Sequence, residues 1–484
     1  MKVSFRSVGA AVVLPLFIAG CVGVRDFSDT KAGFSAVGDK AGQTLGKRTV
    51  WIQDRAEAAE VSGQVRDLLS AKFVDADAAV QVALLNNKSL QAAYAEIGMS
   101  VADLWQESIP ENPTLAVSYM GIGGLRTLEG VIASNLVWVL TRERRLEIAE
   151  VRLLQSRLRA YEATLALATE VRVAWIEAVS AWEQVAYLNR ARIAADAAAE
   201  LAAELGRTGA YPKIEQAREQ AFYSELTAQT AEARLEAQLA KENLVRVMGL
   251  WGPQLDFEVP NSLPAIPGKP VRRDAIEAEA LRNRVDLQVA RLELDSLAKS
   301  YGLTRATRYV SDLELAAGPE IEQEIEERED GSEKRSNDLT AIAEVSLEIP
   351  IFDSGQARLR RAEFGYLKAA NIYAAKSVEI RSEARSAYRA YRSRYDIARH
   401  YRSSVVPLRV NIEKEAILTY NGMITSTFDL LADTRSKLNA IILSVNAKRE
   451  FYLAEAGLTA AVYGGGEVES GGGAEKAAAG GDDD

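Results

Sequence analysis

Leu84–Leu90 reads L-L-N-N-K-S-L, and Leu281–Leu287 reads L-R-N-R-V-D-L. A second pair of similar stretches follows, with R-L-E-I-A-E at Arg145–Glu150 and R-L-R-R-A-E at Arg358–Glu363. Both pairs are separated by about 200 residues, a period that indicates a duplicated half-domain rather than a short-period solenoid. The chain is therefore predicted to contain two tandem structural repeats.

Each repeat has the same predicted order: a helix, a pair of strands and a long helical hairpin. We assign repeat 1 to residues 75–252 and repeat 2 to residues 274–463, with residues 21–74 as a separate N-terminal segment. Five prolines mark residues 253–273 as a linker. Residues 464–484 are Gly-rich, end in three Asp and are predicted to be disordered.

The N-terminus reads as a lipoprotein signal. Lys2 and Arg6 precede the short apolar run Val8–Ile18, and Ile18–Cys21 reads I-A-G-C, which resembles a bacterial lipobox. We expect cleavage of residues 1–20 and acylation of Cys21. Attachment of several acyl chains anchors a protein firmly in a membrane. No Asp follows Cys21, which favours the outer membrane. An uncleaved tethering helix is the alternative.

Composition excludes several classes of function. The net charge is −10, so no basic surface for nucleic acid is expected. With one Cys and one His, the chain can form no internal disulfide framework, and a Cys/His metal site is not expected. His400 lies in an Arg- and Tyr-rich helical stretch and is interpreted as a surface or seam residue rather than a catalytic base. The chain is therefore not expected to be an enzyme or to need a cofactor.

The longest predicted helix, from Arg142 to Leu205, contains neither Pro nor Gly. At 1.5 Å per residue it would measure roughly 100 Å, a length typical of coiled coils. Two apolar seams follow it at spacings of three and four, one through Leu158, Tyr161 and Leu165 and one starting at Leu167 and Val171. Two seams indicate neighbours on two sides, as in the wall of a tube. A long bundle with a solid core is the alternative.

Alternating residues predict four strands. Leu339–Ile351 alternates over about eleven residues, the length of a membrane-spanning strand. Tyr309–Ala317, Thr114–Ile122 and Glu129–Leu140 are the other three, with Trp138 at a membrane interface. The acidic stretch Pro319–Asp338 is expected to be a solvated loop. Four strands cannot close a barrel, and open edges are not tolerated in lipid, so the chain must oligomerise if they span a membrane. A soluble two-hairpin sheet is the alternative.

Several motifs, taken in order, resemble the TolC family of outer-membrane efflux proteins. Ala79–Leu84 and Pro110–Leu115 resemble the family's entry helix and its N-P-x-L strand start. Ile349–Gln356, I-P-I-F-D-S-G-Q, matches its strand-to-helix corner, and Tyr420–Gly422 followed by Phe428–Leu431 matches its helix-tip motif.

The resemblance implies an α+β membrane protein that forms a homotrimer. A twelve-stranded outer-membrane β-barrel, four strands per chain, would continue into a long α-helical periplasmic barrel. Implied partners are a periplasmic adaptor (membrane fusion) protein, an inner-membrane pump of the RND type and outer-membrane lipid. The chain would be lipid-anchored in the outer membrane and extend into the periplasm.

The resemblance also suggests functional residues. Members of the family have two aspartates at the pore constriction. The first position corresponds to Asp429 in this sequence. The second corresponds to Ala432, one residue before Asp433. The hairpin tips that meet the adaptor would be Arg207 and Gly209 in repeat 1. In repeat 2 they would be Gly422, Met423 and Ile424. Both tip glycines are expected to adopt positive φ.

The predicted function is a passive exit duct of a tripartite efflux pump. Metal ions and toxic small molecules are both candidate substrates, since the stretch Tyr420–Arg435 resembles relatives associated with metal resistance. Two alternatives stay open: the outer-membrane component of type I protein secretion, and a structural periplasmic coiled-coil lipoprotein, which would have no membrane strands.

Replacing Cys21 with Ser should abolish acylation, because the thiol is the attachment atom. Labelling cells with radioactive palmitate measures this directly. Label on the Cys21→Ser protein equal to that on the wild type would contradict the lipobox assignment.

Overall fold

The computed structural model describes residues 31, 33–122, 125–209, 211–310, 312–327, 333–422 and 424–465. Cys21, the signal peptide 1–20, Met423 and nearly all of the Gly-rich tail lie outside these ranges. The chain separates into two compact units, which are described one at a time. Unit 1 consists of residues up to Ser35, Ala95–Arg157 and Gln288–Ala375; unit 2 consists of Ala36–Tyr94, Leu158–Leu287 and residues from Lys376 onward.

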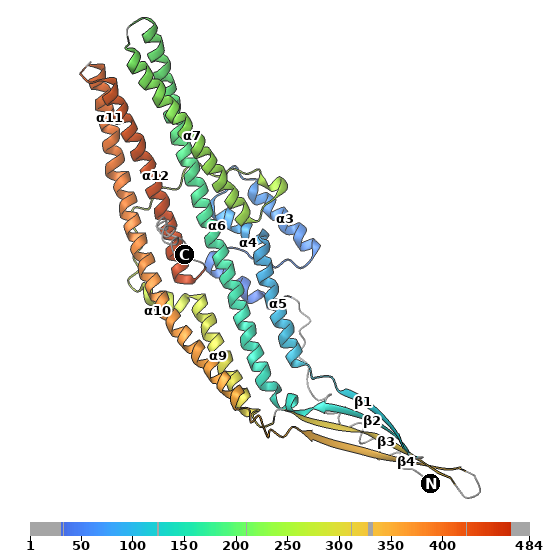
Figure 1. Ribbon diagram of the computed structural model, residues 1–484. Helices are drawn as coiled ribbons and strands as arrows, with labels where there is room; N and C mark the ends of the chain where they lie inside the picture. The colour runs from blue at the N-terminus through green and yellow to red at the C-terminus, as the bar shows by residue number, and fades with distance from the viewer. Residues whose placement is uncertain are drawn as a thin grey trace, which may run out of the picture. The chain divides into compact units, whose positions relative to one another are not determined.

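Helices make up most of the described chain, together with one four-stranded sheet (Figure 1). The helices before the first strand are α2 (Ser35–Leu45), α3 (Arg55–Leu69), α4 (Ala76–Asn86) and α5 (Lys88–Ser108). Between the two strand pairs lie α6 (Leu136–Arg207), α7 (Lys213–Met248), η1 (Gly252–Leu255), α8 (Ile276–Asn283) and α9 (Val285–Ala306). After the last strand come α10 (Gln356–His400), η2 (Tyr401–Val405), α11 (Val406–Asn421) and α12 (Thr427–Tyr463).

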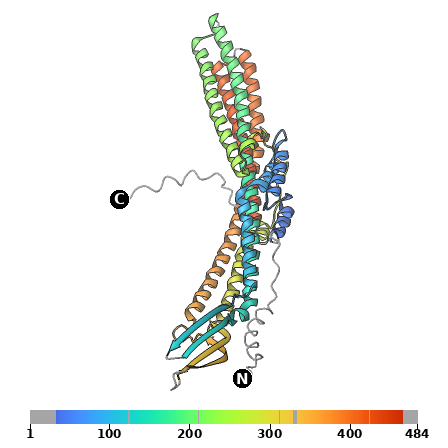
Figure 2. The same ribbon diagram turned by 90° about the vertical axis from the view of Figure 1, so that its right-hand side faces the viewer.

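The sheet of unit 1 is an antiparallel meander in the order β1-β2-β3-β4, visible in Figure 2. Its strands are β1 (Thr114–Ile122), β2 (Leu125–Asn135), β3 (Leu313–Glu327) and β4 (Glu333–Leu347). The predicted bounds of β1 are correct. The predicted acidic loop 319–338 is wrong, because most of it belongs to β3 and β4. Its Glu residues alternate with Ile and Gln, so they follow the two-residue period of a strand despite their charge.

The prediction that a strand continues to Leu140 is also wrong. Asn135 Oδ1 accepts the backbone N–H of Trp138 at 3.2 Å, which is the N-cap interaction that starts a helix, and α6 begins at Leu136. Trp138 is therefore a helix residue rather than an interfacial strand residue. It is 3% exposed, with the Arg145 guanidinium 5.9 Å from the centre of its ring.

In unit 2 the two seams of α6 are largely buried, as predicted. Tyr161, Leu165 and Val171 are each less than 5% exposed. Further along α6, Val185 and Leu188 form one apolar cluster with Phe222 and Leu226 of α7, against which Leu431, Leu438 and Ile442 of α12 pack. Gln184 Nε2 also donates to Asn446 Oδ1 of α12 at 2.6 Å. The helix thus has neighbours on two sides.

Both copies of the opening motif interrupt a helix at their fourth residue. Asn87 separates α4 from α5 with φ −64° and ψ 123°, and Arg284 separates α8 from α9 with φ −57° and ψ 119°. At each break, a side chain contacts a backbone carbonyl near the end of a long helix. Asn87 Nδ2 donates to Val247 O at 2.8 Å at the end of α7, and Arg284 Nη1 lies 3.4 Å from Ala461 O near the end of α12.

Pro407 does not interrupt the continuous helical run formed by α10, η2 and α11. The segment η2 before it is a π-helical turn, in which Val406 N–H bonds to Tyr401 O, five residues back. Such a turn accommodates proline's missing N–H and its ring, which would otherwise disrupt an α-helix. The proline-rich residues 256–275 contain no helix or strand, and tyrosines of α10 bind their backbone: Tyr391 Oη accepts from Val271 N, and Tyr395 Oη donates to Gly268 O.

The two hairpin glycines differ in backbone conformation. Gly209 after α6 has φ +76°, as predicted. Gly422 after α11 has φ −78°, so its predicted positive φ is wrong. Its N–H donates to Leu418 O at 3.0 Å, continuing the helical hydrogen bonding by one residue, and a conformation of this kind suits any L residue.

Replacing Gly209 with Ala should therefore loosen its hairpin, because the left-handed conformation costs an L residue about 1 kcal/mol. Replacing Gly422 with Ala is the matched control and should have little effect, since an added Cβ would meet no atom closer than 3.5 Å. Hydrogen exchange of the flanking amides measures the local opening. Equal protection at the two tips in the two variants would contradict this assignment.

Candidate functional site

The functional residues predicted in repeat 1 lie at the end of the α6–α7 hairpin. Arg207 is the last residue of α6, and its side chain is 73% exposed. Its Nη1 donates to Glu204 Oε1 of the same helix at 2.7 Å. Gly209 follows after one residue, and the chain returns as α7 at Lys213. This end therefore offers an exposed guanidinium beside a tight turn.

The α11–α12 hairpin end carries an exposed apolar residue instead. Ile424 is 77% exposed, and its N–H donates to Thr419 O at 2.9 Å across the turn. The hydroxyl oxygens of Thr419 and Thr425 lie 3.2 Å apart in the same turn. The backbone of the turn is held by its own hydrogen bonds, so the Ile424 side chain remains free for contact.

Asp429 belongs to the first turn of α12. Ser426 Oγ accepts the Asp429 N–H at 3.3 Å, and Asp429 Oδ2 accepts the Ser426 N–H at 3.3 Å and the Ser426 hydroxyl at 2.8 Å. This reciprocal pair is a capping box, which starts the helix. A carboxylate in the first turn also interacts favourably with the helix dipole. Asp429 therefore has a structural role in addition to any role in a pore.

Asp433 lies four residues after Asp429 on α12. Residues at this spacing share one face of a helix, so the structure brings the two predicted carboxylates together on neighbouring turns. Asp429 is exposed and Asp433 is half-buried. The predicted set thus forms two groups within unit 2, one at each hairpin end.

A contact between the two hairpins was not apparent from the sequence. Arg435 Nη2 of α12 pairs with Glu225 Oε2 of α7 at 3.0 Å, and the same guanidinium lies 4.9 Å from the centre of the Phe222 ring. Both carboxylate and guanidinium are about half exposed, so the pair alone adds little stability. Its partners are about 210 residues apart in sequence, and no local pattern connects them.

The two faces of the sheet in unit 1 differ in chemistry. Directly paired residues share a face, so the register places Glu129 with Glu320 and Glu322 with Asp338 on one side. Ser118 Oγ donates to Glu129 Oε2 at 3.0 Å on this acidic face. The opposite face carries exposed apolar residues, which include Leu115, Val117, Tyr119, Leu128 and Val345. Toward the β1–β2 turn, the same face also carries Arg126, Gln323 and Asn337. The two-residue alternation of Glu320 to Glu324 was the signal for the acidic face.

Two further observations concern the described residues. Within the described ranges, no group of three or more His, Cys, Asp or Glu side chains is arranged to hold a metal ion. None of the described helices is both long and apolar enough to cross a membrane.

Residues 278–462 match the family model described as outer membrane efflux protein. No curated protein matches the chain in sequence at a significant level.

Solved structures share the fold. The CmeC outer-membrane channel of Campylobacter jejuni is 16% identical with a TM-score of 0.65, covering 93% of this chain and 94% of its own. CusC is 17% identical with a TM-score of 0.66, covering 82% and 94%. The MtrE outer-membrane channel of Neisseria gonorrhoeae is 16% identical with a TM-score of 0.62, covering 81% and 89%. Residues 278–462 therefore match the outer membrane efflux protein family, and the chain shares the fold of these outer-membrane channels, which confirms the resemblance seen in the sequence.

Proposed function

We propose that three copies of this chain form the outer-membrane exit duct of a tripartite efflux pump. The observation that carries the proposal is the sheet, which has one exposed face rich in apolar residues and two open edges. In the described meander, β1 pairs only with β2 and β4 only with β3. Open edges must be paired in lipid, where no water can satisfy the backbone groups.

Neighbouring copies can supply the missing partners, with β1 of one chain beside β4 of the next. A closed ring of identical chains repeats this contact without leaving an edge. The apolar face would then contact lipid, and the face with Glu129 and Glu320 would line the lumen. The family resemblance implies a trimer, a periplasmic adaptor and an RND-type inner-membrane pump. The lipobox implies acylation of Cys21.

The hairpin ends of unit 2 are the proposed adaptor contacts and gate. Arg207, Gly209, Gly422, Met423 and Ile424 would meet the adaptor protein. Asp429 and Asp433 would line the constriction, where carboxylate rings favour cations. The substrates proposed are metal ions or toxic small molecules. The duct conducts them passively, so it needs neither cofactor nor catalytic residue.

Assembly can be tested with two adjacent substitutions. Full-length protein extracted in detergent should have the mass of three chains and form pores in planar bilayers. Val117→Arg should reduce the trimer in the outer membrane, because a cation on the lipid face costs about 2–4 kcal/mol near mid-bilayer. Ser118→Arg, on the opposite face, should have a smaller effect. A monomer without conductance, or equal loss of trimer in both variants, would contradict the barrel.

Gating can be tested at Asp429. Because this carboxylate also caps α12, Asp429→Asn is preferable to Asp429→Ala: it removes the charge and keeps an acceptor oxygen. If three carboxylates meet at the constriction, the variant should lower the cation-to-anion permeability ratio about two-fold or more and weaken block by trivalent cations. Reversal potentials in a salt gradient measure this.

Asp433→Asn is the second substitution, and Glu60→Gln on the exposed face of α3 is the charge-matched control. The control should leave selectivity unchanged. Unchanged reversal potential and block in both aspartate variants would rule out the acidic gate, whereas the trimer and pore measurements would still test the duct.

A further inference from the structure

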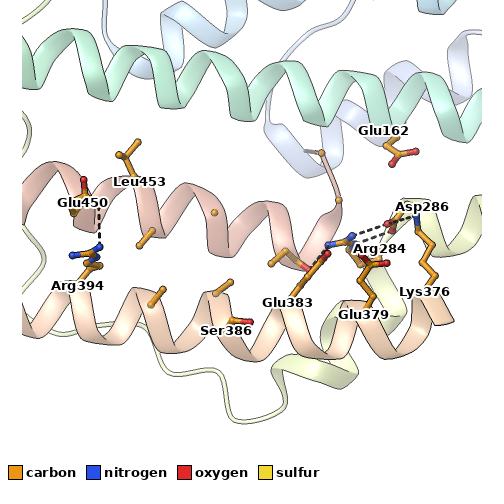
Figure 3. Close-up of a pocket in the computed structure, with 17 residues that line it drawn as sticks. Glu162, Arg284, Asp286, Lys376, Glu379, Glu383, Ser386, Arg394, Glu450 and Leu453 are labelled. Atoms are coloured by element: carbon orange, nitrogen blue, oxygen red, sulfur yellow. Dashed lines mark hydrogen bonds and ion pairs between the residues drawn. The ribbon is translucent and has the colours of Figure 1, made fainter. Parts of the chain in front are cut away.

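Unit 2 contains a cavity of about 690 Å³ that no step of the proposed function uses. It lies between α10, α12, the break between α8 and α9, and Glu162 of α6 (Figure 3). Its volume falls in the range of pockets that hold drug-sized ligands. Near one end, the backbone of Gly465 passes α6 so closely that an added Cβ would lie 2.8 Å from the Leu165 carbonyl carbon.

A balanced ion network forms the charged end of the cavity. Arg284 binds Asp286 through two hydrogen bonds of 3.0 and 2.8 Å, and its Nη1 donates to Glu383 Oε2 at 2.7 Å. Lys376 Nζ lies 3.1 Å from Asp286 Oδ2. Burial alone would raise the pKa of Asp286, but the hydrogen bonds and charges of Arg284 and Lys376 outweigh it and lower this pKa. Two cations and two carboxylates therefore neutralise one another.

Glu162 and Glu379 also line the cavity and add negative charge beyond this balance. Glu162 is half-buried, and in the described part of the chain its carboxylate accepts no hydrogen bond. Burial raises its pKa first, and the charge of Asp286 raises it further, against Lys376, Arg284 and the neighbouring Arg159. A partly buried carboxylate without a hydrogen-bonded cation is costly, and a bound cation would remove that cost.

The rest of the wall is apolar and made of small residues. Leu453, Ala454 and Ala461 of α12 line one side, and Ala387 and Ala390 of α10 line another. Short side chains at these positions leave the volume open. At the far end, the Glu450 carboxylate is already paired, with Arg394 at 3.5 Å and with Arg449 at 3.0 Å.

We propose that the cavity is a binding site for an amphipathic organic cation, with its charged nitrogen at Glu162 and its apolar body along the alanines of α10 and α12. A neutral apolar ligand would leave Glu162 without a counter-ion. An anion would be repelled by Glu162 and Glu379, because the cations of the network are already paired. The arrangement therefore selects for positive charge at one end and apolar surface at the other.

This inference does not depend on the proposed exit duct, since binding is measured without transport. Full-length protein in non-ionic detergent is titrated with ethidium, a fluorescent organic cation, and with N-phenyl-1-naphthylamine, an uncharged probe. Saturable ethidium binding is expected. Glu162→Gln should weaken it about ten-fold, equivalent to about 1.4 kcal/mol, and leave the uncharged probe unaffected.

Two further variants make the result specific. Glu200→Gln removes a carboxylate from an exposed position of the same helix and should change ethidium affinity less than about two-fold. Ala454→Leu fills part of the cavity and should weaken ethidium binding while all charges remain; it decides the question even if Glu162→Gln fails to fold. Absence of saturable ethidium binding, or wild-type affinity in Glu162→Gln or Ala454→Leu, would overturn the proposal.

Discussion

The rest of unit 2 depends on how the last carbonyl groups of α7 and α12 are satisfied. The final four carbonyls of a helix have no partner within it and need hydrogen bonds from elsewhere. Backbone N–H groups just past the helix ends satisfy some of them, at Val245, Arg246 and Ala460. Side chains at or beside the breaks at Asn87 and Arg284 satisfy others. Asn86 Nδ2 and Asn87 Nδ2 bind Gly249 O and Val247 O, and Arg284 Nη1 reaches Ala461 O. Each break therefore lies beside the end of a long helix and is tied to it by side-chain hydrogen bonds.

The chemistry of the two breaks differs, with consequences for the cavity. Asn87 is neutral, and Asn87 Cα lies 3.2 Å from where a Cβ on Gly249 would be, so this junction is closely packed. Arg284 is charged and largely buried, so it requires counter-ions, which Asp286 and Glu383 provide. These longer, charged side chains hold α10 and the end of α12 around an open space. The cavity with Glu162 is therefore specific to the second break.

The hairpin ends and the sheet show the same combination of structural and functional demands. Asp429 starts α12 through its capping box, so the carboxylate proposed for the constriction also stabilises the helix that presents it. In the sheet, the register of β2 and β3 places Glu129 directly opposite Glu320. Like charges in direct opposition destabilise a strand pair. An aqueous lumen on that face would reduce this repulsion by solvation, which agrees with the proposed orientation of the barrel.

The sequence by itself determined the element types and their order. The Pro- and Gly-free stretch of α6 and its two seams predicted a long helix with two neighbours, and alternation predicted β1 with its correct bounds. Two local signals were misread. The charge of the Glu run at Glu320–Glu324 indicated a loop, but the run belongs to a strand, and Asn135 is an N-cap that starts a helix. These patterns could be predicted because the periods of helices and strands are properties of the local backbone.

Only the tertiary structure decided which distant residues meet. The sheet register that joins Glu129 to Glu320 and the pairing of Arg435 with Glu225 each depend on how far one element is shifted along another. The position of Glu162 of α6 facing α10 and α12 across the cavity depends on such shifts too. Such shifts are set by packing and hydrogen bonds between elements, which leave no periodic trace in the chain. The negative φ of Gly422 has a similar cause, because the turn is determined by its hydrogen bonds to Leu418 and Thr419 and not by the freedom of glycine.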